Sequence, residues 1–248
     1  MKWAYVFLAA IVVQTSSVFG QAVMPDNLRA ASTIDRMSNF TGTNVPDFLY
    51  GIPAAPGKVI GDTYLNTEFN TSNVLLYEND KIIEGYPVRY DVYTNELEFN
   101  AKNGIKVMNG GKVKSFAWID EKSKLPEYFI NAKEFRNSEN VQLIGFFQVL
   151  SDGALPLLKK TTVDVKKPDY NEALNVGSRD AKILKKAEQF YAVGNKVFKV
   201  PASKKNVLSL FADKSAEMEK FIADKSLSMA KEEHLITIFN HYNLLVKK

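Results

Sequence analysis

The sequence has no cysteine and only two histidines among its 248 residues. The lack of thiols excludes cysteine nucleophiles, thiolate metal sites and disulfide bonds. His234 and His241 stand seven positions apart in a segment with helical spacing, whereas helical metal pairs use spacings of three or four. We therefore expect no metal site and no cofactor.

Sequence motifs of several common enzyme families are missing as well. The chain has no G-x-S-x-G nucleophile motif, no phosphate-binding P-loop and no Rossmann glycine fingerprint. A Ser-His-Asp triad stays open, because its members converge from distant positions in a sequence. These absences favour a protein that binds over one that catalyses.

Long apolar runs are confined to the beginning of the chain. Lys2 precedes an apolar run at 5–13, and Val18-Phe19-Gly20 precedes Gln21. This pattern predicts a secretory signal peptide at 1–20, cut after Gly20. No cysteine is present for a lipid anchor, and no later run approaches the roughly 18 apolar residues of a membrane helix. We expect an exported protein, periplasmic or extracellular, that is soluble after cleavage and has no transmembrane segment.

The charge distribution is uneven. The net charge of +4 is too small to indicate a nucleic-acid partner. Residues 155–205 nevertheless carry twelve basic and five acidic side chains, in pairs such as Lys159-Lys160 and Lys185-Lys186. Such a block fits attraction to an anionic envelope surface, or lysines on strand faces and edges that deter edge-to-edge aggregation. We expect a monomer, or at most weak association.

The hydropathy pattern divides the rest of the chain into three parts. Residues 21–57 predict an irregular N-terminal arm with a short helix at 27–37. Residues 58–201 alternate polar and apolar side chains in short runs, which predicts an antiparallel β meander. Residues 202–248 change to helical spacing behind Ser203, a suitable N-cap, and predict about three short helices packed on the sheet. The predicted fold class is mainly β, as a curved sheet, half-barrel or barrel.

Turn residues locate the hairpins of this meander. Asn109-Gly110-Gly111 separates runs at 105–108 and 112–119, and asparagine and glycine tolerate the positive φ that tight turns require. The segment 151–154 is a second predicted turn, and Gly194-Asn195 is a third.

Three stretches of the chain resemble a bacterial protein family. They are Gly61-Asp62-Thr63-Tyr64-Leu65-Asn66, Pro87-Val88-Arg89-Tyr90-Asp91-Val92-Tyr93, and the tail from Glu219-Lys220-Phe221-Ile222 through Asn240-His241-Tyr242-Asn243. They are similar to an uncharacterised family of exported proteins of Bacteroidota-type bacteria, which has the same order of signal peptide, β meander and helical tail. The likeness covers most of residues 60–245. It implies a cell-envelope location and, because the family has no assigned activity, it supplies no catalytic residues.

Charged side chains crowd the predicted hairpin at 88–99. Arg89, Asp91 and Tyr93 share one face of a strand, and Glu96 and Glu98 follow on the next strand. The carboxylates fit the acid and base of a hydrolase acting on envelope glycan or lipid, or a Ca²⁺ site. They equally fit the solvated face of a half-buried sheet, with Arg89 paired to Asp91.

Two adjacent aromatic residues are the remaining candidates for a binding face. Phe146 and Phe147 must point to opposite sides of a strand, so one of them lies away from the main core. That ring lies under the C-terminal helices, which we favour, or in a ligand groove, or at a partner surface. Together these features predict a non-enzymatic binding protein that contacts an envelope lipid, glycan or protein through the concave face of the sheet. The hydrolase is the alternative.

Overall fold

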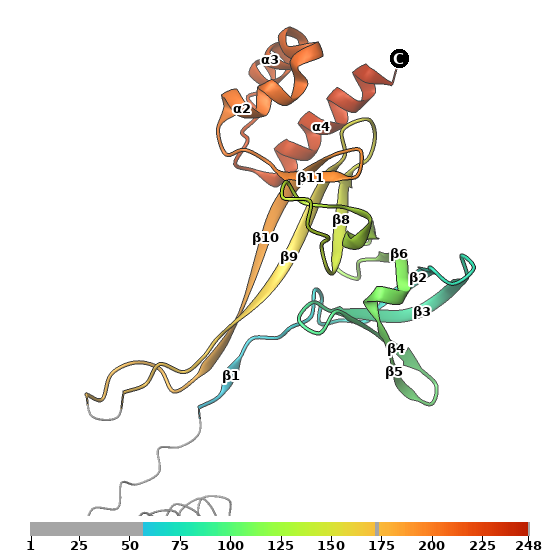
Figure 1. Ribbon diagram of the computed structural model, residues 1–248, viewed down its shortest axis with the longest axis vertical. Helices are drawn as coiled ribbons and strands as arrows, with labels where there is room; N and C mark the ends of the chain where they lie inside the picture. Colours follow the sequence, from blue (N-terminus) through green and yellow to red (C-terminus); the bar gives the residue numbers. More distant parts are fainter. Residues whose placement is uncertain (1–56, 172–173, 248) are drawn as a thin grey trace, which may run out of the picture. The chain divides into compact units, whose positions relative to one another are not determined.

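The structure, a computed structural model, describes residues 57–171 and 174–247. The predicted signal peptide, the helix at 27–37 and nearly all of the arm at 21–57 lie outside these ranges. The described residues form one sheet followed by helices (Figure 1). The strands are β1 (Val59–Ile60), β2 (Asn70–Leu76), β3 (Ile82–Asp91), β4 (Glu96–Ala101), β5 (Gly104–Asn109), β6 (Val113–Ile119), β7 (Pro126–Asn131), β8 (Phe146–Ser151), β9 (Leu157–Lys166), β10 (Ala181–Val193) and β11 (Lys196–Lys199).

The sheet joins two antiparallel meanders. β2 to β5 pair in chain order, β6 returns to pair with β2, and β6 to β10 then pair in order. β11 pairs with one end of β10, and β1 lies parallel to its other end. The row ends at β1 and β5 without closing, which confirms the predicted mainly β fold as an open curved sheet and not as a barrel.

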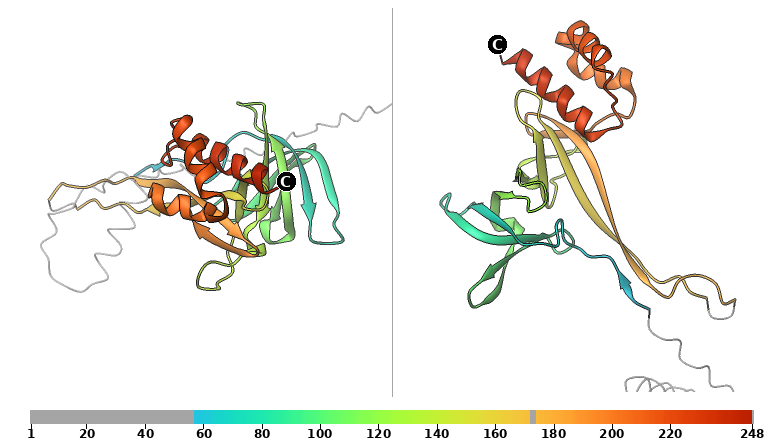
Figure 2. Two further views of the ribbon diagram at one scale, coloured as in Figure 1. Left: turned by 90° about the horizontal axis from the view of Figure 1, so that it is seen from above. Right: turned by 180° about the vertical axis from the view of Figure 1, so that it is seen from behind.

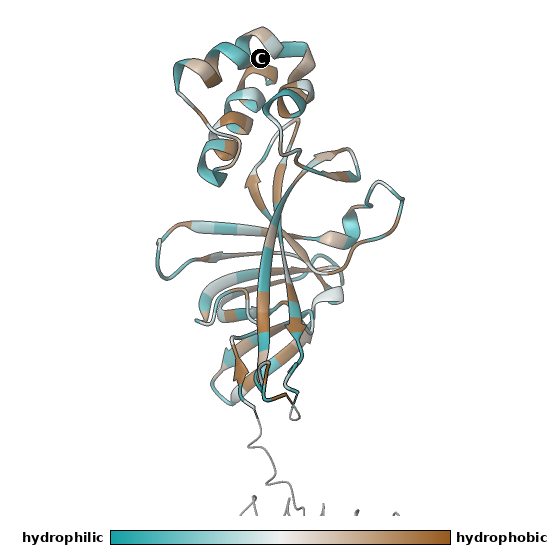
Figure 3. Ribbon diagram, turned by 90° about the vertical axis from the view of Figure 1, so that its left-hand side faces the viewer, coloured by the Kyte–Doolittle hydropathy of each residue, from teal (hydrophilic) through white to brown (hydrophobic). Residues whose placement is uncertain are grey.

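Two of the predicted turns are confirmed. β8 and β9 pair across the turn that contains residues 151–154, and β10 and β11 pair across Gly194-Asn195. Gly194 has φ 59°, the left-handed conformation expected at a tight turn. Burial alternates along the second half of β9, from Thr161 to Lys166, as the two-residue period of a strand requires, and Figure 3 shows hydrophilic and hydrophobic residues on both long strands.

The hairpin predicted around Asn109-Gly110-Gly111 is wrong. β5 pairs only with β4, whereas β6 lies between β2 and β7. The segment is instead a 3-10 turn, η1 (Gly110–Lys112), in which the Gly111 N–H donates to Oδ1 of Asn109 at 2.9 Å. Gly110 approaches Asn95 so closely that a Cβ atom would lie 2.4 Å from Oδ1 of Asn95. Asparagine and glycine serve here for capping and close approach, not for chain reversal between paired strands.

The main core lies on the face of the sheet that carries Phe116, Phe129 and Gln148, termed the inner face. The Phe116 and Phe129 rings stack with centroids 4.5 Å apart. Buried residues of six strands meet around them: Val74, Leu76, Val88, Tyr90, Leu97, Phe99, Val113, Phe116, Trp118, Phe129 and Phe146. Trp118 of this cluster also lines the polar surface that lies beside it on the same face.

The C-terminal segment folds as predicted into short helices. They are α2 (Lys204–Leu208), η3 (Ser209–Lys214), α3 (Ser215–Asp224) and α4 (Glu232–Val246). Ser203 caps α2 by accepting a hydrogen bond from the Asn206 N–H at 3.3 Å. The apolar side chains of the helices form a second core cluster with Leu155 and Leu157, and α4 lies beside the β8–β9 turn in both views of Figure 2. None of the helices within the described ranges has the length and hydropathy of a membrane span.

Candidate functional site

A pocket of about 540 Å³ opens on the inner face where β6 to β10 lie side by side. This volume falls within the roughly 300–1,000 Å³ that is usual for ligand sites. Most of the lining side chains are polar or charged, and we therefore term it the polar pocket. The lining residues are Asp62, Leu65, Asn66, Thr67, Trp118, Asp120, Lys122, Glu127, Gln148, Lys159, Thr161, Lys185 and Ala187.

One wall of the polar pocket is formed by residues 61–69, termed the crossing segment because they run from the β10 edge to β3. At its start, Asp62 forms an ion pair with Lys185 of β10 at 2.6 Å. Further along, the Leu65 N–H donates to the Tyr90 carbonyl oxygen of β3 at 2.9 Å. The segment is therefore fastened to strands on both sides of the pocket.

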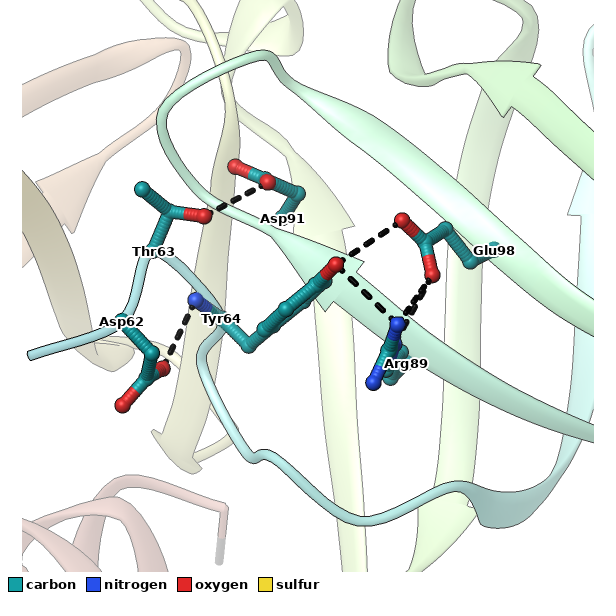
Figure 4. A network of polar contacts seen from close by, with 6 residues as sticks. All are labelled: Asp62, Thr63, Tyr64, Arg89, Asp91 and Glu98. Atoms are coloured by element: carbon teal, nitrogen blue, oxygen red, sulfur yellow. Dashed lines mark hydrogen bonds and ion pairs between the residues drawn. The ribbon is translucent and has the colours of Figure 1, made fainter. Parts of the chain in front are cut away.

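Arg89 and Glu98 hold the crossing segment through Tyr64 (Figure 4). They face each other across β3 and β4, and Nη2 of Arg89 lies 2.7 Å from Oε2 of Glu98. The Tyr64 hydroxyl donates to Oε1 of Glu98 at 3.0 Å. The guanidinium also covers the Tyr64 ring at 3.9 Å and the Phe69 ring at 4.5 Å from their centroids. The predicted pairing of Arg89 with Asp91 is therefore wrong, because the cross-strand neighbour is closer than the next residue on the same face.

Tyr64 titrates in the field of this cluster. Burial and the hydrogen bond to Glu98 raise the pKa of the Tyr64 hydroxyl, and the positive charge of Arg89 acts in the opposite direction. The hydroxyl consequently stays protonated at neutral pH and remains a donor to Glu98. The cluster is a fully paired support rather than a set of free acids and bases.

Asp91 caps the end of β3. Oδ2 accepts a hydrogen bond from the Thr63 hydroxyl at 2.6 Å, and Oδ1 accepts from the N–H groups of Tyr93 and Thr94 at 2.8 and 3.0 Å. Asp91 is 9% exposed, and each of its carboxylate oxygens has a donor within the protein. Glu96 lies opposite Asp91 in the strand register. The side chain of Tyr93 is 61% exposed.

None of these five hairpin residues lines the polar pocket. The structure brings Arg89, Asp91 and Glu98 together around the crossing segment, where they position one wall of the pocket. Tyr93 and Glu96 belong to neither the pocket nor the Arg89 cluster. The hairpin thus contributes to the site through the chain that it holds in place.

Phe146 and Phe147 are both buried, with exposures of 5% and 0%. Phe146 belongs to the main core and contacts Tyr90 and Phe116 edge-on. Phe147 belongs to a third cluster on the opposite face, in edge-on contact with Phe135 and Phe190. The expectation that the C-terminal helices cover the second ring is wrong, because the chain that follows β7 reaches it first and fills that space.

A carboxylate held by two neutral donors lies on the polar pocket. Oε2 of Glu127 accepts a hydrogen bond from Nε1 of Trp118 at 2.8 Å, and Oε1 accepts from Nε2 of Gln148 at 3.0 Å. Trp118 is buried, with 2% of its surface exposed. These two donors orient Glu127 without neutralising its charge, and no ion pair of Glu127 occurs within the described residues.

Two lysines lie across the pocket from Glu127. Nζ of Lys159 contacts Glu232 at the start of α4 at 2.8 Å, and the same carboxylate accepts from Gln189 at 3.0 Å. Lys185 pairs with Asp62 as described above. Each ammonium has three donors, so donors remain for a ligand. Ala187 forms the floor of the pocket between the two lysines. Because its side chain is small, it leaves space there for a ligand.

Sequence reasoning missed the pocket residues because they are spread over more than a hundred positions. The lysine pairs of the sequence could have indicated part of the pocket. Strand neighbours alternate between faces, so Lys159 and Lys185 line the pocket whereas Lys160 and Lys186 point to the opposite side. Burial lowers the pKa of Lys160, and Lys186 pairs with Glu188 at 2.8 Å.

No protein-family model, curated protein or solved structure matches the chain. The roles of the residues therefore follow from their geometry. The geometry offers a hollow lined by fixed hydrogen-bond donors and acceptors, which is suited to holding a polar molecule in one orientation.

Proposed function

We propose that this chain is an exported cell-envelope protein that binds a small polar ligand in the polar pocket without transforming it. The observation that carries the proposal is the pocket itself: about 540 Å³ on the inner face, lined by side chains whose orientations are set by other side chains. Pre-oriented polar groups lower the ordering cost of binding. The sequence-predicted signal peptide supports the envelope location.

The lining favours a glycan or a peptide over a lipid chain. An acyl chain requires an apolar channel, whereas the polar pocket presents Asp62, Asp120, Glu127 and three lysines. Placing hydrocarbon against these groups would remove the hydrogen bonds that they still make to solvent, at a cost of about 1–3 kcal/mol each. A ligand that supplies hydrogen bonds avoids that cost.

The paired state of the hairpin carboxylates supports binding over hydrolysis. Glycosidases place two carboxyl groups on opposite sides of a bond to be cleaved. Here Glu98 is engaged by Arg89 and Tyr64, and Asp91 by Thr63 and the turn that follows β3. Both groups stabilise the crossing segment.

Native mass spectrometry tests the proposal. The full chain is mixed separately with a muropeptide digest of bacterial peptidoglycan, with oligosaccharides from lipopolysaccharide and with phospholipid. We expect a defined mass adduct with a peptidoglycan or lipopolysaccharide fragment. Ala187→Leu, which fills the floor of the pocket from an exposed position, should abolish it.

Leu184→Phe is the matched control. Leu184 is 49% exposed on the opposite face of β10, so this variant adds bulk to the same strand without entering the pocket. It should retain the adduct. Absence of an adduct with all three preparations, or an adduct that survives Ala187→Leu, would overturn the proposed function.

A further inference from the structure

Glu127 is the one pocket carboxylate that no cation balances within the described residues. Asp62 is paired with Lys185. Asp120 accepts a hydrogen bond from the Ser123 N–H at 2.7 Å, which is the main cause that lowers its pKa, and the charge of Lys122 is a smaller cause in the same direction. Glu127 contacts only the Trp118 indole N–H and the Gln148 amide. A half-buried carboxylate whose neighbours are neutral can bind a positively charged group.

The opposite end of the pocket has the reverse character. Gln148 pairs in register with Lys159, so Glu127 and Lys159 flank it on neighbouring strands of the same face. Lys159 and Lys185 each use a donor on a protein carboxylate and keep others for a ligand. The pocket thus presents an acceptor of cations on β7 and donors to anions on β9 and β10.

We propose that the polar pocket binds a zwitterionic ligand of short-peptide size, with its ammonium at Glu127 and its carboxylate at Lys159 or Lys185. This inference rests on the proposed function and names the class of ligand. Strands lie about 4.8 Å apart, so β7 and β9 are separated by roughly 10 Å. An extended tripeptide spans about the same length, at roughly 3.3–3.6 Å per residue.

A neutral saccharide fits these observations less well. Sugar rings are commonly held against an exposed aromatic face, and the only aromatic side chain of the lining, Trp118, is 2% exposed with its N–H given to Glu127. A sugar also brings no charge for Glu127. A peptide therefore pairs with more of the charged groups of the pocket than a saccharide does.

Binding of tri-alanine to the full chain tests the inference. In a Trp3→Phe background Trp118 is the only tryptophan, so its fluorescence reports events at Glu127 directly. The ligands are tri-alanine, its N-acetylated form, its C-terminal amide and chitotriose. We expect tri-alanine to bind, and each blocked peptide to bind roughly tenfold to a hundredfold more weakly, the ratio typical for loss of a charged hydrogen bond.

Variants of the pocket residues test the contacts of the two ends of the ligand separately. Glu127→Gln keeps the shape of the side chain, and it should weaken tri-alanine but not the N-acetylated peptide. At least one of Lys159→Met and Lys185→Met should weaken tri-alanine but not the C-terminal amide. Unfolding in urea checks that the variants fold, and Leu184→Phe should bind every ligand as the parent does.

The outcomes distinguish this inference from the proposed function. Equal binding of tri-alanine and its acetylated form, or no effect of Glu127→Gln on tri-alanine, overturns the zwitterion. Failure of tri-alanine to bind, together with an envelope adduct that Ala187→Leu removes, also overturns it and leaves the proposed function standing. Failure of every ligand in both experiments overturns both.

Discussion

Asn243 of α4 and Leu155 of the β8–β9 turn exchange two hydrogen bonds. The Leu155 N–H donates to Oδ1 of Asn243 at 2.8 Å, and Nδ2 of Asn243 donates to the Leu155 carbonyl oxygen at 3.0 Å. Nδ2 also donates to the Ser151 hydroxyl at 3.2 Å. The side-chain amide takes the place of a strand partner and fastens the last helix to the sheet.

Asn243→Ala is expected to destabilise the protein by about 2–4 kcal/mol, because it leaves two backbone groups of the buried Leu155 without partners. Urea unfolding followed by circular dichroism measures the change. Leu244→Ala, at a neighbouring position that is 65% exposed, should stay within about 0.5 kcal/mol of the parent. Similar midpoints for the two variants would show that the Asn243 bonds are dispensable.

Gly153 lies in the same turn, with φ 142° and with Asn243 packed against it. A Cβ atom there would lie 2.6 Å from Cγ of Asn243. We expect Gly153→Ala to cost about 1–3 kcal/mol for backbone strain, and more for the displaced amide. Gly194→Ala, with φ 59° and no atom near the added methyl, should cost only about 1–2 kcal/mol. A cost for Gly153→Ala no larger than that of Gly194→Ala would contradict the close contact.

The Arg89–Glu98 pair should couple measurably. The two side chains are 21% and 17% exposed, so solvent screens them less than it screens a surface pair. A double-mutant cycle with Arg89→Met and Glu98→Met is expected to give a coupling of about 1 kcal/mol in urea unfolding. The same cycle on Lys114 and Asp80, which are 44% and 70% exposed, should give less than about half of that. Equal couplings would mean that the Arg89 cluster is only a surface feature.

Tyr90 should make the protein sensitive to alkali. It is 3% exposed, its hydroxyl donates to Oδ1 of Asn95 at 3.0 Å, and burial raises its pKa above the ordinary 10.0, helped by the charge of Asp91. A raised folded-state pKa gives stability that is complete below the unfolded pKa and is lost as the pH rises above it. Tyr90→Phe should therefore show a shallower loss of unfolding free energy above about pH 10 than the parent.

Urea unfolding at several pH values between about 8 and 11 measures this slope. The control is Tyr128→Phe, because the Tyr128 side chain is 55% exposed and its hydroxyl can be solvated in both states. Tyr128→Phe should lose unfolding free energy with rising pH as steeply as the parent does. A Tyr90→Phe limb as steep as the parent's would assign the alkaline loss to other groups, of which Tyr77 is the first candidate because burial and Glu134 raise its pKa.

The sequence predicted the elements better than their pairing. Alternation at period two located β3 and β4, and helical spacing located α3 and α4. The Asn109-Gly110-Gly111 turn misled because the same residues suit a hairpin and a capped 3-10 turn. Which one forms depends on whether β6 finds β2, whose first residue lies more than 40 positions upstream of β6, and no local pattern encodes that choice.

The candidate site was predicted only in part for a related reason. The charged hairpin stood out because Arg89, Asp91 and Glu98 are close in sequence, and it proved to be a support. Glu127, Lys159 and Lys185 come from three different strands, and only the register of the sheet brings them to one face. Charged residues that are close in sequence are easy to detect, but they tend to pair with each other. Once paired, they have little capacity left to bind a ligand.

The parallel pairing of β1 with β10 has a consequence for the order in which the molecule is completed. The Lys58 N–H donates to Oδ1 of Asp180, 122 positions later, and Val59 stands opposite Ala181. During synthesis from the N-terminus, the start of the crossing segment must wait for nearly the whole β region to emerge, because contacts this distant carry a large loop-closure cost. The wall of the pocket is thus assembled late, and a nascent or truncated chain lacking β10 would have the sheet's first meander but no complete polar pocket.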